Sequence, residues 1–209
     1  MRNRVLLVST ALILLAGCKA DEVEITLRTD DILDVSQGGS EMVEFEAVFS
    51  TFGDLDDEER AQVEALEDIL ERYVELDDFE LDKTDMGFEV SIEGEIAMTS
   101  DLSTSDAYFV GVSPSKIVEG AYLVQLNTGS NFNAMQLEME DISFMLSPDA
   151  FHPTRFKIRG DEEFDIIAPA VQIDGRYHLI WRGKTQDRIS MTFANGAFDE
   201  VGAGFLIKP

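Results

Sequence analysis

The sequence predicts an α+β fold, in which an antiparallel β-sheet or sandwich carries one amphipathic helix packed on it. Three observations support this fold class. Short segments in both halves of the chain alternate between apolar and polar residues, residues 57–74 repeat apolar side chains at helical spacing, and turn-forming pairs separate the alternating segments. Since no linker or low-complexity tract interrupts residues 23–209, we expect them to form a single α+β domain.

Two strands are predicted near the start of this domain, at residues 23–27 and 43–49. In each of them apolar residues alternate with polar ones, which is typical of a strand with one buried face. The segment between them ends in the turn-rich residues 36–40, with two adjacent glycines. We therefore expect these two strands to pair in antiparallel fashion.

Residues 57–74 form the one clear predicted helix. Asp56 is a suitable N-cap, and Glu59 three residues later completes a capping box. The apolar side chains lie on one stripe, from Val63 to Val74, while acidic residues cover the other side. The stripe indicates that this helix packs on the core of the sheet.

The rest of the chain is predicted to be β structure. Asp174-Gly175 lies between two alternating runs and is a strong hairpin signal, and Asn195-Gly196 is a second one. Gly94 interrupts a long strand and indicates a bulge or a close approach of another backbone. The predicted strands lie at residues 79–81, 88–98, 107–112, 121–126, 136–144, 156–158, 171–173, 177–181, 189–193 and 205–207.

The first residues have the character of an export signal. Residues 1–4 carry two arginines, residues 5–15 form a short apolar run, and Leu15-Ala16-Gly17-Cys18 follows. This pattern resembles the signal peptide and lipobox of bacterial lipoproteins. The resemblance implies a signal peptide at residues 1–17, fatty acylation of Cys18, and a lipidated anchor with a short tether at residues 18–22. In this family an Asp directly after the cysteine retains the protein in the inner membrane, and this chain has Lys19 at that position. The implied location is therefore the cell envelope, at the outer membrane facing the periplasm.

The charge of the chain is strongly negative and unevenly distributed. There are 42 Asp and Glu residues against 16 Lys and Arg, a net charge of −26, and most of the acids lie in the first half. Nucleic acid is excluded as a partner, because binding to phosphate requires clustered Lys and Arg. Cys18 is the only cysteine, so we expect neither a disulfide nor a cysteine metal site in the domain.

An acidic face is the predicted candidate site. Its five glutamates are expected on the outer side of two strands: Glu44, Glu46, Glu89, Glu93 and Glu95. If these strands pair, carboxylates lie opposite each other, which is destabilising. A basic protein of the envelope or a cation such as calcium would relieve the repulsion; a solvated coat of charge is the simpler interpretation. No calcium-loop spacing is present, so any calcium site is predicted to be weak, and no other cofactor is expected.

No catalytic constellation is found in the sequence. Zinc-protease, nucleophile-elbow, phosphate-loop and dinucleotide motifs are absent, so the chain is predicted not to be an enzyme. The layout of lipobox, strands and acidic helix is similar to that of several bacterial and phage-borne lipoprotein families with no assigned function. We expect a membrane-anchored, non-enzymatic binding or structural module. The alternative is a chaperone-like or lipid-binding lipoprotein of the periplasm with a groove lined by Met and aromatic residues.

Overall fold

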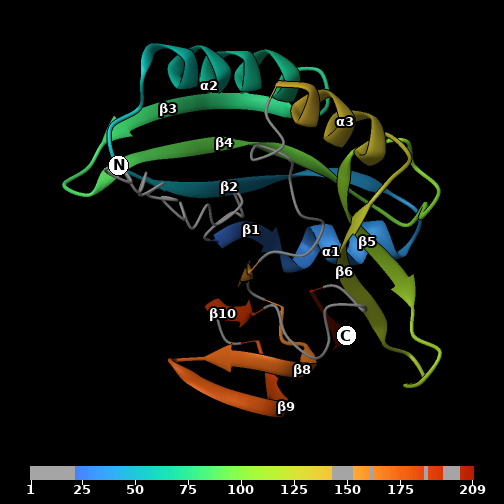
Figure 1. Ribbon diagram of the computed structural model, residues 1–209. Coiled ribbons are helices and arrows are strands. Elements are labelled where there is room, and N and C mark those ends of the chain that lie inside the picture. The colour runs from blue at the N-terminus through green and yellow to red at the C-terminus, as the bar shows by residue number, and fades with distance from the viewer. Residues whose placement is uncertain (1–21, 143–152, 161, 186–187, 195–202) are drawn as a thin grey trace, which may run out of the picture.

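The computed structural model describes residues 22–142, 153–160, 162–185, 188–194 and 203–209. Within these residues the chain forms three helices and eleven strands (Figure 1). The helices are α1 (Thr29–Ser36), α2 (Asp57–Leu70) and α3 (Phe132–Ile142). The strands are β1 (Glu22–Arg28), β2 (Ser40–Phe52), β3 (Glu75–Lys83), β4 (Gly87–Thr99), β5 (Tyr108–Pro114), β6 (Tyr122–Thr128), β7 (Thr154–Arg159), β8 (Asp165–Ile173), β9 (Arg176–Lys184), β10 (Arg188–Phe193) and β11 (Gly204–Lys208).

The sheet closes on itself. Its strand order is β10-β7-β1-β2-β4-β5-β6-β11-β8, and β8 pairs again with β10, which makes a closed ring of nine strands. Most neighbours are antiparallel, but β1 pairs with β7 and β4 with β5 in parallel. Two strands lie outside the ring, since among the described strands β3 pairs only with β4 and β9 only with β8.

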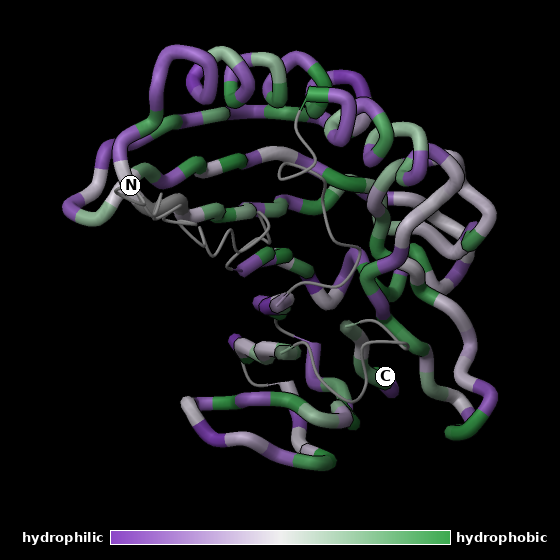
Figure 2. The backbone as a smooth tube through the Cα atoms, viewed as in Figure 1, coloured by the Kyte–Doolittle hydropathy of each residue, from purple (hydrophilic) through white to green (hydrophobic). Residues whose placement is uncertain are grey.

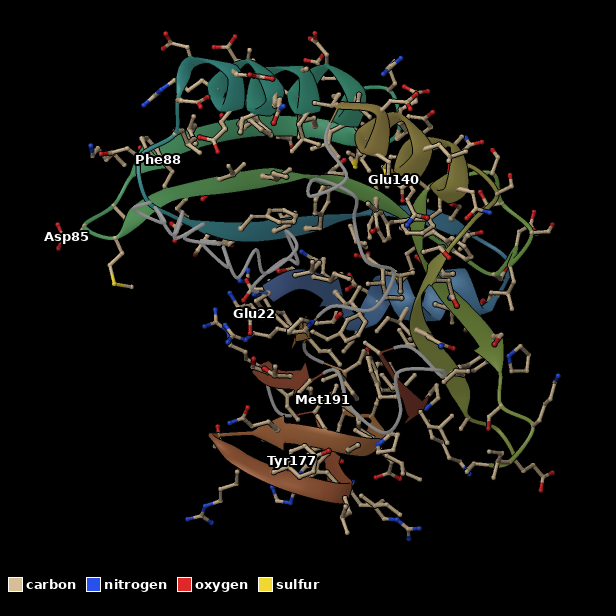
Figure 3. The ribbon with its side chains drawn as sticks, viewed as in Figure 1. Glu22, Asp85, Phe88, Glu140, Tyr177 and Met191 are labelled. Atoms are coloured by element: carbon tan, nitrogen blue, oxygen red, sulfur yellow. The ribbon has the colours of Figure 1, made fainter. Side chains whose placement is uncertain are left out.

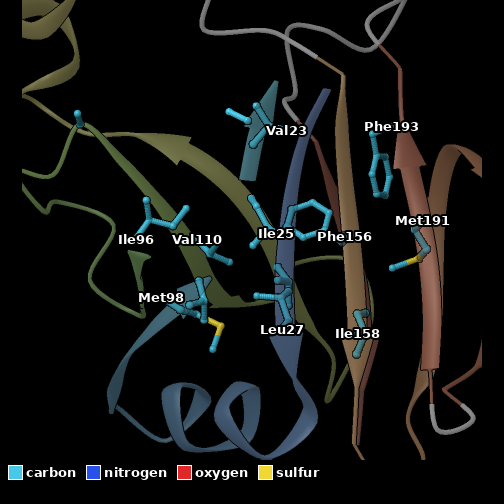
Figure 4. Packing of buried hydrophobic residues seen from close by; sticks show 14 of the residues in the cluster. Val23, Ile25, Leu27, Ile96, Met98, Val110, Phe156, Ile158, Met191 and Phe193 are labelled. Atoms are coloured by element: carbon cyan, nitrogen blue, oxygen red, sulfur yellow. The ribbon is translucent and has the colours of Figure 1, made fainter. Parts of the chain in front are cut away.

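The interior of the closed sheet is filled with apolar side chains from strands far apart in the sequence. Hydrophobic residues alternate with hydrophilic ones along these strands, so that one side of each faces inward (Figure 2). Phe156 of β7 is fully buried and lies beside Ile25 of β1 and Phe193 of β10 (Figure 4). The largest fully buried side chains are Phe109, Phe156, Phe205, Ile25, Leu27, Ile32, Met98, Met135, Ile158, Ile166, Met191 and Ile207.

This architecture corrects the predicted fold class. The protein is mostly β, with the sheet closed into a barrel and three short helices; it is not an open α+β sheet or sandwich with one helix packed on it. The alternation along each segment indicated strands correctly, but it carries no information on which strands pair across the molecule. Closure depends on contacts such as β10 with β8 and β1 with β7, which join distant segments.

Helix α2 has the predicted start. The Asp56 side chain accepts hydrogen bonds from the amides of Glu58 and Glu59, both at 2.9 Å, and the Glu59 carboxylate accepts one from the Asp56 amide at 2.8 Å. The predicted capping box is therefore confirmed. The helix ends at Leu70, four residues before the predicted end.

Two helices were missed. Residues 29–36, between the first two predicted strands, form α1, which buries Thr29, Ile32 and Val35. Residues 136–142 were predicted as part of a strand but belong to α3, whose buried residues Phe132, Met135 and Met139 are spaced as on a helix. The rest of that predicted strand, together with the Asn195-Gly196 turn, lies outside the described residues.

Candidate functional site

The five predicted glutamates lie on two neighbouring strands. Strands β2 and β4 pair over thirteen residues in a register that places Glu44 opposite Glu95 and Glu46 opposite Glu93. Glu89 of β4 lies opposite Ser50 instead. Their neighbours along each strand are buried or half-buried, so these glutamates lie on the outer side of the sheet.

The acidic surface extends over four strands. Strand β1 adds Glu24 beside Glu46, and β3 adds Asp78 beside Glu93. Four carboxylates, one from each strand, therefore form a row across the sheet: Glu24, Glu46, Glu93 and Asp78. A second row crosses β2, β4 and β3: Glu44, Glu95 and Glu75. We call the outer side of these four strands the acidic face.

The acids of β3 were not predicted as part of this face. Asp78 and Asp82 lie opposite Glu93 and Glu89 of β4. Their alternation with Phe79 and Leu81 in the sequence predicted a strand here, but its neighbour was not identifiable. The sequence signal for the additional acids was therefore present, whereas their place in the site depended on the pairing of β3 with β4.

In the described part of the chain, basic side chains form ion pairs with the acidic face at its β1 edge. On β7, next to β1, Arg155 forms ion pairs with Glu22 at 2.8 Å and with Glu24 at 3.4 Å, and Lys157 pairs with Glu24 as well. Figure 3 labels Glu22 near β1. Partial burial raises the pKa of the Glu22 carboxyl above its ordinary value, and the Arg155 guanidinium opposes this shift. The β1 edge of the face is thus partly neutralised by the protein itself.

Farther from β7 the carboxylates have no such compensation. Within the described part of the chain, no ion pair reaches Glu44, Glu46, Glu89, Glu93 or Glu95. Directly opposite residues in an antiparallel sheet have Cβ atoms about 4.5–5.5 Å apart, and like charges at this spacing destabilise the pair. The face therefore holds repulsive charge that a cationic partner would compensate.

The arrangement does not form a metal centre among the described residues. No three carboxylate, histidine or cysteine side chains of residues 22–142 and the later described segments converge as ligands for an ion. This is the expected geometry of a strand ladder, because neighbouring side chains on one sheet face point outward side by side rather than toward a common centre. The acidic face is consequently an extended surface, suited to a partner with several positive charges.

We expect Glu93→Lys to stabilise the protein. The new ammonium group would lie between Glu46 and Asp78, replacing two repulsive pairs by two attractive ones. Cross-strand charge pairs contribute about 0.2–1 kcal/mol each. The free energy of unfolding in urea should rise more for this variant than for Glu119→Lys, which makes the same charge change at an exposed loop position. Equal values for the two variants would show that the rows store no measurable repulsion.

No protein-family model matches the chain, and no curated protein matches it. Among the described helices, none has the length and apolar character required to cross a membrane.

Proposed function

We propose that this chain is an exported lipoprotein, held to a membrane by acyl chains on Cys18, which acts as a non-enzymatic binding module for a basic protein. The observation that carries the proposal is the acidic face, where rows of carboxylates cross β1, β2, β4 and β3 in register. Such a field raises the rate of association with a positively charged partner and repels anionic ones.

The extent of the face favours a protein partner over a small cation. Glu44, Glu46, Glu93 and Asp78 are all exposed. A basic segment or surface that lies across the strands can contact several rows at once, whereas a single ion compensates only the carboxylates that converge on it. Binding of this kind also relieves repulsion within the protein, so that the partner stabilises the folded chain.

The anchor would hold the face close to the bilayer. Residues 19–21 separate Cys18 from the first residue of β1, and an extended chain spans at most about 3.3–3.6 Å per residue. Since β1 is itself one strand of the acidic face, a partner bound there would lie near the membrane surface. We propose the outer membrane, facing the periplasm, as the location.

The test is a pull-down from envelope extracts with the chain from Lys19 onward, which keeps every described helix and strand. The face variant is Glu44→Gln/Glu46→Gln/Glu93→Gln. The matched control, Glu64→Gln/Asp68→Asn/Glu71→Gln, neutralises three acids on and just after α2. We expect basic proteins to bind the unchanged chain and the control, to be lost with the face variant, and to be released by salt, because the screening length falls from about 10 Å at 0.1 M to about 3 Å at 1 M.

Three outcomes would contradict the proposal. Partners that persist in strong salt do not depend on charge, and partners retained by the face variant bind elsewhere on the molecule. Lipid that copurifies with the domain, detected by mass spectrometry, would favour the alternative of a lipid-binding lipoprotein. Met135 and Met139 of α3 are buried in the hydrophobic core of the described residues.

A further inference from the structure

Two of the described strands have an edge with which no other described strand pairs. Strand β9 pairs only with β8 and strand β3 only with β4 among the described strands, and neither belongs to the closed ring. The other edge of each strand therefore carries backbone N–H and C=O groups that no described strand satisfies. Such an edge is a template for pairing with another chain, and monomeric proteins commonly protect it with charge or irregularity.

Strand β9 combines charged ends with an exposed apolar centre. The side chains of Tyr177, Leu179 and Ile180 are 59%, 74% and 65% exposed. All three lie within four successive residues of this strand. Arg176 and Arg182 flank them, are exposed, and form no ion pair within the described residues. An edge strand with three exposed apolar side chains between two exposed arginines is typical of an interaction surface. Figure 3 shows Tyr177 on the β8–β9 hairpin, at the end of the molecule opposite α2.

Strand β3 offers the complementary chemistry. It is nine residues long, as is β9, and its exposed acids form no ion pair in the described chain: Glu75, Asp77, Asp78, Glu80 and Asp82. A bulge interrupts its pairing with β4 between Leu76 and Asp78, and the segment from Asp78 to Lys83 then continues in regular register. Within that segment Phe79 and Leu81 are half-buried apolar residues packed against the core.

We propose that β9 of one copy adds to the free edge of β3 in a second copy of this chain. Main-chain hydrogen bonds between the two edges would provide affinity. Because side chains alternate between the two faces of a strand, Arg176 and Arg182 would share a face with the acids of β3. Tyr177 and Leu179, on the other face of β9, would lie beside Phe79 and Leu81. Strands β3 and β9 lie on opposite sides of the molecule (Figure 1), so the contact cannot form within one copy. It is a head-to-tail contact, in which each copy offers one donor edge and one acceptor edge.

Charge favours a second copy over a lipid surface as the occupant of β9. The net charge of −26 opposes the approach of anionic head groups and of another copy alike. In another copy, however, β3 brings five acids to the edge that β9 would join with Arg176 and Arg182, so attraction at the contact itself offsets this repulsion. A single strand–strand contact is small, so we expect weak association in solution. If the chain is anchored as proposed, confinement to a membrane raises its effective concentration and strengthens the contact. The inference itself goes beyond the proposed function and needs no other protein.

Sedimentation velocity of the chain from Lys19 onward, over a wide concentration range at low salt, provides the test. We expect the average size to grow with concentration past the dimer, because a head-to-tail contact that does not close continues to add copies. The β9 variant Leu179→Glu/Ile180→Glu and the β3 variant Glu80→Ala/Asp82→Ala should each weaken association about tenfold or more. All four side chains are exposed or half-exposed, so the fold should be retained, as circular dichroism can verify.

Mixing the two variants gives the decisive result. One of them keeps an intact β3 edge and the other an intact β9 edge, so the mixture should form a one-to-one dimer and nothing larger. Ile117→Glu, which changes a side chain 89% exposed in the loop after β5, should associate like the unchanged chain. The face variant Glu44→Gln/Glu46→Gln/Glu93→Gln should also still associate, even if the proposed basic partner is lost.

The inference is overturned if the chain stays monomeric at every concentration, or if the β9 variant associates as well as the unchanged chain. It is also overturned if the mixture of variants stays monomeric while the unchanged chain associates, because the contact is then not between β9 and β3. Binding to phosphatidylglycerol vesicles that the β9 variant loses, from a chain that is monomeric in solution, would assign this strand to the lipid surface instead.

Discussion

Phe156→Ala is expected to lower the free energy of unfolding by about 3–5 kcal/mol, the usual loss when a fully buried aromatic ring is truncated. Phe156 is completely buried on β7. Its ring meets Phe193 of β10 at a centroid distance of 5.9 Å and Phe205 of β11 at 5.4 Å, both edge to face. The side chain therefore joins strands on different sides of the closed sheet. Its loss leaves a cavity that the surrounding strands cannot fill without breaking the pairing that closes the sheet.

Urea unfolding followed by circular dichroism measures this effect. The matched control is Phe79→Ala, which removes the same atoms from β3. This strand lies outside the closed ring of strands, and the Phe79 side chain is only half-buried. We expect the control to lose clearly less stability. A loss below about 1 kcal/mol for Phe156→Ala, or equal losses for both variants, would mean that the interior of the closed sheet does not hold the fold together.

Gly94→Ala is expected to detach β3 from β4. A Cβ atom at this position would lie 2.2 Å from the carbonyl oxygen of Glu75 and 3.0 Å from the Phe45 ring. Backbone cannot move aside as a flexible side chain can, so the strand must shift at the irregular register between Leu76 and Asp78. Overpacking of this kind costs about 1–3 kcal/mol. The prediction that Gly94 marks a bulge or a close approach of backbone is confirmed.

Hydrogen exchange separates this local effect from general destabilisation. Amides of β3 should exchange faster in Gly94→Ala, while those of β1 and β7, deep in the closed ring, should stay protected. Ser91→Ala, on the same strand with its side chain on the outer face, should leave the β3 amides as they are. If β3 exchange is unchanged in Gly94→Ala, the close approach to Glu75 is not a constraint on the pairing.

Elements whose pattern is local were predictable from the residues alone. Alternation at residues 23–27 and 43–49 predicted β1 and β2, and the Asp56 and Glu59 pair predicted the start of α2. The Asp174-Gly175 turn is confirmed as well, since both residues have positive φ, 50° and 73°, as a two-residue hairpin loop requires. In each case the signal is contained in a few neighbouring residues, where side-chain direction and capping act directly.

The two missed helices show where local patterns become ambiguous. Residues 136–140 alternate between polar and apolar over five positions, as a strand does, yet the apolar residues that become buried, Phe132, Met135 and Met139, repeat with helical spacing. Over so short a window both periods fit, and packing decides between them. The Tyr73 hydroxyl, three residues after α2, donates a hydrogen bond to Glu138 of α3 at 2.7 Å and so joins segments 65 residues apart.

The same division applies to the candidate site and to the whole fold. The alternation of apolar and acidic residues placed the acids on the outer side of individual strands. This was possible because successive side chains along a strand point to opposite faces. Three features arose only in the tertiary structure: the closure of nine strands, the rows of carboxylates in register, and the edges of β3 and β9 with which no described strand pairs. Pairing depends on hydrogen bonds and buried contacts between segments far apart in sequence, and no single segment contains the information that selects its partner.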